Sequence, residues 1–247
     1  MNGNAAIALV TGANKGIGFE IARQLAAGGM TVLLAARDPG RRDQATAALR
    51  SAGLDVRPVT LDVTGPASVQ AAAQQVGADF GRLDVLVNNA GISGSGAGSP
   101  GSANLDAVRA VFDTNVFGVM RVTNAMLPLL KRSAAGRIVN VSSGVGSMGY
   151  MTNPDHYMSR LPAVAAYPAS KAALNALTVQ YAKELGPLGI LVNAAAPGAC
   201  ATDFTKNLGL AISRTAADGA AIAVKLATLG PGGPTGGFFD DNGPVPW

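Results

Sequence analysis

The sequence predicts a single α/β domain in which helices cover both faces of a parallel sheet. Short apolar segments alternate with longer alanine-rich segments along most of the 247 residues, and this alternation is typical of repeated strand-helix-strand units. Few polar residues interrupt the short segments, as expected of strands that are buried on both faces. The composition agrees with one large core, because 48% of the residues are hydrophobic and 14% are charged.

The same pattern predicts the elements in chain order. Strands are expected at residues 6–10, 31–35, 56–61, 85–88, 137–142, 190–194 and 237–239. Helices are expected at residues 17–27, 41–52, from Pro66 onward, around 105–131, at 165–186 and at 213–229. Because right-handed crossovers place helices on both sides of a parallel sheet, the expected architecture is a doubly wound, Rossmann-type sheet.

Three segments rich in glycine, serine and proline interrupt this pattern, at residues 91–102, 144–162 and 230–246. They follow expected strands or end the sequence. In open parallel sheets, ligands bind beyond the carboxyl ends of the strands, where such loops gather. We therefore expect a binding site for a small molecule at this edge of the sheet.

Composition argues against several other classes of protein. No apolar run approaches the roughly 20 residues that span a bilayer, and the first residues lack the pattern of a secretory signal. We therefore expect a cytoplasmic protein that does not bind membranes. Cys200 and His156 are the single residues of their types, so we expect no metal site and no internal disulfide. The basic residues behind the net charge of +4 are scattered, so we expect no nucleic-acid partner.

A glycine loop joins the first expected strand to the first expected helix. Its three glycines have the spacing G-x-x-x-G-x-G. In this position backbone N–H groups and the helix dipole can face the pyrophosphate of a dinucleotide. The alternative is a tight turn that only packs the helix against the strand. The residues of this loop predicted to bind the dinucleotide are Gly12, Asn14, Lys15, Gly16, Ile17 and Gly18.

Arg37 and Asp38 end the second expected strand, where such folds distinguish a ribose hydroxyl from a 2′-phosphate. A basic residue there favours NADP, and an acidic one favours NAD. Arg37 comes first and Lys15 lies in the adjacent loop, so two cations can bind a phosphate. Asp38 precedes Pro39, and this pair is typical of a helix N-cap. We therefore predict NADP(H). In the alternative, Asp38 accepts hydrogen bonds from the ribose and Arg37 is a solvated surface residue.

Tyr167 and Lys171 are four residues apart at the start of an expected helix, so their side chains share one face. Reduction of a carbonyl group requires a proton donor beside its oxygen, but an ordinary phenol has a pKa of about 10. A neighbouring ammonium stabilises the phenolate and brings the phenol closer to the working pH. The pair therefore indicates acid–base chemistry, although the same spacing also occurs by chance on amphipathic helices.

Taken in order, these motifs resemble those of the short-chain dehydrogenase/reductase family over nearly the whole chain. The resemblance implies hydride transfer between NADP(H) and a carbonyl/alcohol pair, with a catalytic set of Asn115, Ser143, Tyr167 and Lys171. Its register selects Ser143 rather than Ser142, and alternation along the strand agrees. It also implies that Asn115 holds a water that links Lys171 to solvent. The alternative for Asn115 is a buried amide whose hydrogen bonds are satisfied locally.

The resemblance also implies cofactor contacts farther along the chain. Residues after the third strand would contact adenine, and residues after the fourth would line the adenosine ribose. Lys171 would hold the nicotinamide ribose, and the loop after the sixth strand would cradle the carboxamide. The residues concerned are Asp62, Val63, Asn89, Ala90, Gly91, Tyr167, Lys171, Pro197, Gly198 and Thr202.

Ser143 and Tyr167 are 24 positions apart, about twice the separation in many single-domain members of the family. The sequence therefore predicts one domain over residues 1–247 with an active-site insertion at about residues 150–162. The insertion and the ending resemble the carbonyl reductase branch, in which a longer insertion covers a helix face often used for dimerisation. Both a monomer and a homo-oligomer thus stay open. Tyr157 has Leu161 where a catalytic lysine would stand, and we expect His156 to be a loop residue.

Two other functions use the same scaffold. One is a lyase, epimerase or dehalogenase without net redox turnover, and the other is a nucleotide-sensing protein without catalysis. The substrate pocket is expected between residues 93–99, the segment 144–162 and the segment after Pro197. Its apolar residues favour a moderately hydrophobic carbonyl compound, and they are Val145, Met148, Tyr150, Met151, Leu161 and Phe204.

Overall fold

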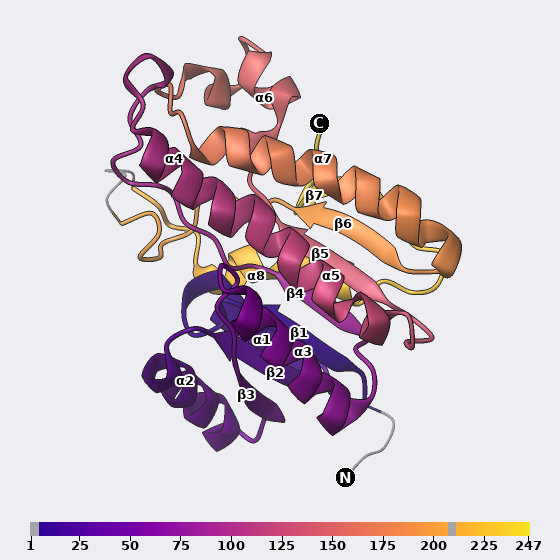
Figure 1. The fold of residues 1–247 in the computed structure, drawn as a ribbon. Helices are drawn as coiled ribbons and strands as arrows, with labels where there is room; N and C mark the ends of the chain where they lie inside the picture. Colours follow the sequence, from indigo (N-terminus) through magenta and orange to yellow (C-terminus); the bar gives the residue numbers. More distant parts are fainter. Residues whose placement is uncertain (1–4, 207–210) are drawn as a thin grey trace.

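One eight-stranded sheet runs through the computed structural model, which describes residues 5–206 and 211–247 (Figure 1). The order across the sheet is β3-β2-β1-β4-β5-β6-β7-β8, and every neighbouring pair is parallel except β7 and β8. The predicted doubly wound α/β architecture is confirmed. The strands are β1 (Ile7–Thr11), β2 (Thr31–Ala36), β3 (Val56–Thr60), β4 (Val85–Asn88), β5 (Arg137–Val141), β6 (Leu191–Ala195), β7 (Phe238–Asp240) and β8 (Gly243–Pro244).

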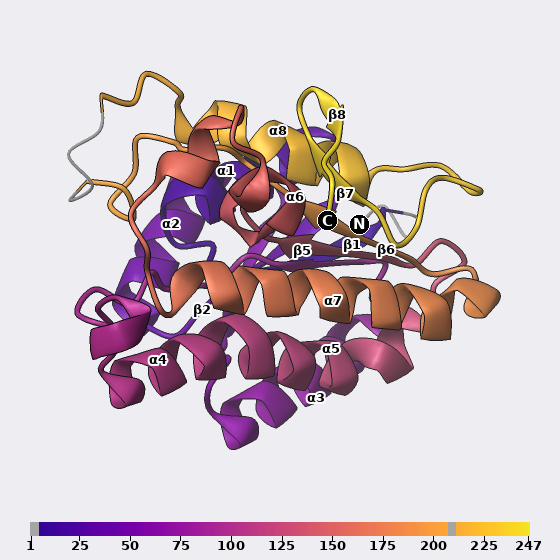
Figure 2. The same cartoon turned by 90° about the horizontal axis from the view of Figure 1, so that it is seen from above.

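Helices form a layer on each face of the sheet, as Figure 2 shows from above. One layer contains α1 (Gly16–Ala27), α2 (Pro39–Ser51) and α8 (Ala216–Ala227), and the other contains α3 (Pro66–Phe80), α5 (Gly118–Leu130) and α7 (Tyr167–Leu185). Successive residues of a strand pack against opposite helix layers. Leu9 belongs to the core beneath α3, α5 and α7, whereas Val10 belongs to the core beneath α1 and α8. This period of two, with a helix layer on each face, explains why most residues of the strands are apolar.

The strand order reverses between β1 and β4. The chain passes from β1 to β2 and β3 on one side, and then crosses back to β4 on the other side of β1. The connections leaving β1 and β4 therefore diverge, and a crevice between their carboxyl ends is the usual ligand position in such sheets. The glycine loop follows β1, and residues 89–91 follow β4, so both predicted cofactor segments flank this position.

The helix predicted at residues 105–131 runs without a break from Leu105 to Leu130, but it is not a regular α-helix throughout. It is divided into α4 (Leu105–Phe112), one π-helical turn η2 (Asp113–Phe117) and α5. A π turn widens the helix by one residue and frequently marks a functional site. Asn115 lies within it and bonds to the loop after β4. This long-range contact accompanies the irregular turn, and the apolar periodicity of the sequence does not encode it.

Several boundaries in the second half of the chain also differ from the predicted ones. The helix expected from residue 213 begins at Ala216, because Thr215 and Asp218 form a reciprocal capping box. The segment 144–162 contains η3 (Gly144–Gly146), α6 (Met148–Thr152) and η4 (Tyr157–Arg160). The last expected strand is followed by an unpredicted antiparallel partner, β8. The remaining short turns are η1 (Pro100–Ser102) and η5 (Gly186–Leu188).

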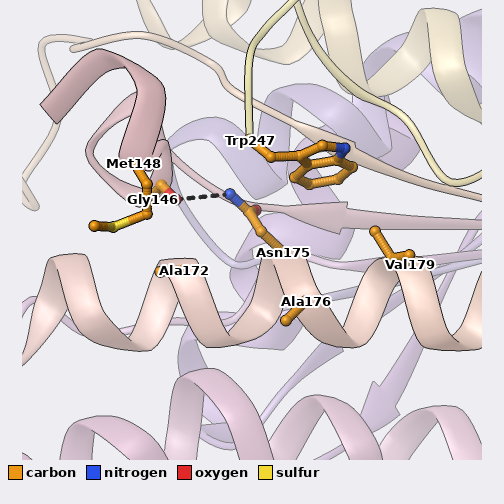
Figure 3. A pocket seen from close by; sticks show the side chains of 7 residues that line it. All are labelled: Gly146, Met148, Ala172, Asn175, Ala176, Val179 and Trp247. Carbon is orange, nitrogen blue, oxygen red and sulfur yellow. Dashed lines mark hydrogen bonds between the residues drawn. The ribbon is translucent and has the colours of Figure 1, made fainter. Parts of the chain in front are cut away.

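The last residues pack against the start of α6. Trp247 stacks on Phe238 with 5.5 Å between ring centroids, and its carbonyl accepts a hydrogen bond of 2.8 Å from the Gly149 amide. Trp247 and Met148 also line a hollow of about 180 Å³ above α7 (Figure 3). Across the described residues, none of the helices is both long and apolar enough to cross a membrane.

Candidate active site

Ser143 and Tyr167 meet beyond the carboxyl end of β5. Ser143 is the second residue after this strand, and Tyr167 is the first residue of α7. Close packing between η3 and α7 fixes their relative position. A Cβ atom on Gly146 would lie 2.9 Å from the Cβ of Lys171 and 2.8 Å from its carbonyl carbon, so only glycine allows this approach. The predicted serine, tyrosine and lysine are thereby brought to one place.

Ser142 and Ser143 have different environments. The buried hydroxyl of Ser142 donates to Oδ1 of Asn175 at 2.6 Å, and Nδ2 of Asn175 donates to the carbonyl of Gly146 at 3.0 Å. Ser142 is thus occupied in holding η3 on α7. Ser143 is only half-buried, and its side chain lies close enough to the phenol of Tyr167 to lower the pKa of that phenol. This geometry supports the choice of Ser143 as the residue that contacts a substrate oxygen.

The phenol of Tyr167 is a weak acid in this structure. Burial raises the pKa of Tyr167 to about 12, and the hydrogen bond with Ser143 acts in the opposite direction. The ring of Phe204 packs against it at 5.3 Å between centroids. An additional positive charge near the phenol is therefore required before it can exchange a proton readily at neutral pH.

Lys171 supplies a positive charge close to this phenol. Its Nζ atom lies 5.7 Å from the centroid of the Tyr167 ring and donates to the carbonyl of Val141 at 2.7 Å. The side chain is buried, and burial lowers the pKa of Lys171 to about 8. Lys171 is consequently charged at neutral pH and titrates just above it. A structural role alone does not require a buried ammonium at this position.

Asn115 is fully buried beside Lys171, and both its side-chain oxygen and its side-chain nitrogen form hydrogen bonds within the protein. Its Oδ1 accepts from the Ile92 amide at 2.9 Å, and its Nδ2 donates to the Ile92 carbonyl at 2.9 Å and to Oγ of Ser170 at 3.0 Å. This matches the interpretation of a locally satisfied amide. The amide holds the loop after β4 against α7, whereas its part in supplying protons stays a prediction.

The glycine loop is closely joined to the end of β4. Gly16 has a φ of +60°, and a Cβ atom on Gly18 would lie 2.3 Å from Nδ2 of Asn89. Thr11, which sequence reasoning missed, accepts hydrogen bonds of 3.0 Å from the amides of Asn89 and Ala90. Its only sequence signal is a hydroxyl directly before the loop. No side chain caps α1, so the N–H groups of its first turn are available to an anion.

The end of β2 is followed by a residue that caps the next helix and by several arginines. Asp38 accepts from the Arg41 amide at 3.0 Å and caps α2, as its position before Pro39 predicts. Arg37 is exposed, and its charge helps to lower the pKa of Asp62, although the backbone hydrogen bond from Thr64 has the larger effect. Sequence reasoning did not single out Arg41, whose charge also acts on Asp203.

The loop after β6 reaches across to the glycine loop. Gly198 has a φ of +75°, and the methyl group of Thr202 lies 3.6 Å from the position of a Cβ atom on Gly16. Lys15 forms an ion pair with Asp203, with 2.7 Å between Nζ and Oδ2. The segments predicted to hold the pyrophosphate and the nicotinamide carboxamide of a dinucleotide are therefore neighbours at the edge of the sheet.

Comparison with known proteins agrees with this arrangement. Residues 6–212 match the family model for short chain dehydrogenases. The chain belongs to the short-chain dehydrogenase family. It is 40% identical over 229 residues to the short-chain dehydrogenase anuI of Penicillium roqueforti, covering 91% of this chain and 89% of the relative. It is 33% identical to salutaridine reductase of Papaver bracteatum, covering 94% and 93% of the two chains.

Among solved structures, this short-chain dehydrogenase is similar to an NADPH-bound carbonyl reductase from chicken fatty liver. The TM-score is 0.86 at 33% identity, and the likeness covers 98% of this chain and 99% of the other. Within the described part of the dehydrogenase, no three His, Cys, Asp or Glu side chains gather as they would around a metal ion.

The segment 144–162 of this dehydrogenase brings aromatic and apolar side chains near Ser143. Tyr150 and His156 stack with 3.9 Å between their ring centroids, and His156 accepts from the Met158 amide at 3.3 Å. The methyl group of Met158 fills the space above Gly144, where a Cβ atom would lie 2.4 Å away. Met148 lies apart from these side chains. It is exposed and lines the hollow beside Trp247, which none of the four predicted catalytic residues lines (Figure 3).

Proposed function

We propose that this short-chain dehydrogenase is an NADP(H)-dependent oxidoreductase that reduces aldehydes or ketones to alcohols, or catalyses the reverse reaction. The observation that carries the proposal is the convergence of Ser143, Tyr167 and the buried ammonium of Lys171 at the end of β5. Similarity to the NADPH-bound carbonyl reductase supports both the reaction and the cofactor. A buried lysine whose pKa is lowered toward neutrality, beside a phenol, is typical of functional sites.

The residues of the crevice fit a dinucleotide phosphate. The uncapped first turn of α1 offers N–H groups to the pyrophosphate, and Gly16 adopts the positive φ that the loop before this turn requires. Lys15 and Arg37 provide charge for the 2′-phosphate, and we add Arg41 to this group. The remaining predicted contacts are Asp62 and Val63 at the adenine, Asn89, Ala90 and Gly91 at its ribose, and Pro197, Gly198 and Thr202 at the nicotinamide.

NADPH, when bound, supplies the hydride and leaves a positive charge on its oxidised ring. Ser143 donates a hydrogen bond to the substrate carbonyl oxygen and orients it toward Tyr167. The phenol of Tyr167 gives its proton to that oxygen, so that the alcohol forms. The charge of Lys171 stabilises the resulting phenolate, which offsets the burial that raises the pKa of Tyr167. Asn115 holds the loop at Ile92 against the start of α7.

Side chains beside the catalytic pair suggest the substrate class. Phe204 packs on Tyr167, and Met158 covers Gly144 next to Ser143. These apolar groups favour a moderately hydrophobic carbonyl compound.

The proposal is tested by initial rates of cofactor oxidation at 340 nm with hydrophobic ketones, aldehydes and quinones, and with small charged keto acids. We expect turnover of hydrophobic carbonyl compounds with NADPH preferred to NADH. Comparable turnover of the keto acids would contradict the substrate class. Cofactor binding without turnover across the whole panel would favour a non-redox enzyme or a nucleotide sensor.

Replacing Arg37 tests the choice of cofactor. Charge-assisted hydrogen bonds contribute about 1.5 to 3 kcal/mol, so Arg37→Ser is expected to raise the KM for NADPH by about 10-fold to 100-fold. The KM for NADH should stay the same, because NADH has no 2′-phosphate. Arg109→Ala, which removes an exposed arginine paired with Asp106 on α4, is the control and should change neither constant. Equal loss with both cofactors would contradict the assignment.

A further inference from the structure

Arg214 joins three segments of the chain through one guanidinium group. Its Nε donates to the carbonyl of Pro197 at 2.8 Å, and its Nη2 donates to the carbonyl of Asp218 at 2.8 Å. The same Nη2 forms an ion pair with the carboxylate of Asp241. Arg214 therefore ties the carboxyl end of β6 to the first turn of α8 and to the turn between β7 and β8.

The backbone of Arg214 also holds the loop after β6. Its carbonyl accepts from the amide of Ala201 at 2.8 Å. The side chain lies against Gly198, where a Cβ atom would be 3.3 Å from Nε of Arg214. The start of this loop is thus hydrogen-bonded to Arg214 at two points, the Pro197 carbonyl and the Ala201 amide. These points lie within the loop proposed to face the nicotinamide.

An arginine suits this position because its acceptors lie in different directions. A guanidinium presents five N–H groups in a rigid plane, and it can bind two carbonyls and a carboxylate together. Lysine carries three donors on one atom and cannot reproduce this arrangement. The Asp241 carboxylate is present only because β8 folds back on β7, so the terminal hairpin completes the arrangement.

We propose that Arg214 is a positioning residue that fixes the loop from Pro197 to Thr202 for the nicotinamide half of the cofactor, with Asp241 orienting its guanidinium. This inference rests on the proposed function. Arg214 has no contact with the glycine loop among its hydrogen bonds and ion pair. Its loss should therefore weaken binding of the nicotinamide end and leave the adenosine end unchanged.

The experiment compares two ligands on Arg214→Met, which keeps much of the side-chain length but removes the donors. NADPH binding is measured by fluorescence titration, and adenosine 2′,5′-bisphosphate, which lacks nicotinamide, by calorimetry. We expect the Kd for NADPH to rise about 10-fold and the Kd for the bisphosphate to change less than about twofold. Asp241→Asn, which keeps the shape of the side chain, should raise the Kd for NADPH about threefold.

Arg82→Met is the matched control. Arg82 is exposed to a similar degree, pairs with Asp84 and donates to a backbone carbonyl at the amino ends of the strands. It should leave both dissociation constants unchanged. An unchanged Kd for NADPH in Arg214→Met and Asp241→Asn, or equal weakening of both ligands, would overturn the inference. If the unaltered protein does not bind NADPH, both the proposed function and this inference fail. If the unaltered protein and the variants all bind NADPH equally well, only the role of Arg214 is overturned.

Discussion

Replacement of Tyr167 by phenylalanine is expected to lower carbonyl-dependent oxidation of NADPH by about 10³-fold, within the range attributed to a positioned general acid. Only the hydroxyl is removed, so the contacts of the ring with Phe204 and Lys171 remain possible. The loss should appear in kcat, and the Kd for NADPH should stay within about twofold, because the hydroxyl acts mainly in the transition state. Stopped-flow rates and fluorescence titration measure the two quantities.

Tyr157→Phe is the control for this experiment. Tyr157 lies in η4, is 62% exposed and, like Tyr167, follows Ser143 in the sequence. Its variant should keep full activity. If Tyr167→Phe retains more than a third of the activity, or if Tyr157→Phe loses activity instead, the proton donor has been assigned to the wrong phenol.

Replacement of Lys171 by methionine is expected to lower turnover by about 10²-fold or more, because the charge that stabilises the phenolate is removed. The same change should stabilise the protein at neutral pH. Burial lowers the pKa of Lys171 to about 8, against about 10.4 in an unfolded chain. The folded state is therefore destabilised by the charged ammonium. After the lost hydrogen bond to Val141 is subtracted, we expect a gain of about 2 kcal/mol in the free energy of unfolding.

The effect of Lys171 on the free energy of unfolding changes with pH in a defined direction. Between about pH 8 and 10.4 the folded protein has released the Lys171 proton while the unfolded chain still binds it, so this group makes stability rise with pH. The advantage of Lys171→Met should accordingly shrink between pH 7 and pH 9.5. The kcat/KM for carbonyl reduction by the unaltered protein should fall above about pH 8, as Lys171 loses its charge.

Urea unfolding at pH 7 and pH 9.5 measures the stability of both proteins. Lys183→Met, which replaces an exposed lysine on the same helix, should change neither stability nor turnover. A Lys171→Met variant that is less stable than the unaltered protein at pH 7 would show that the bond to Val141 outweighs the effect of burial.

The sequence by itself determined the sheet, its strands β1 to β7 and the residue types at its carboxyl edge. These features depend on local patterns. An uninterrupted apolar segment such as β2 must be covered on both faces, and Asp38 before Pro39 caps a helix wherever the pair occurs before one. Tyr167 and Lys171 share a face once they lie on a helix. Their meeting with Ser143 follows from the order of the strands.

Tertiary structure decided the features that depend on contacts between distant residues. The π turn around Asn115 accompanies bonds to Ile92 and Ser170, and Thr11 binds amides 78 and 79 positions away. Arg214 acquires its acceptors only after the terminal hairpin has folded. Met148 is apolar like the residues near the catalytic edge, yet it lies beside Trp247. Hydrogen-bonding partners and side-chain directions of this kind are set by packing between segments, whereas periodicity in a sequence reports only which residues are buried.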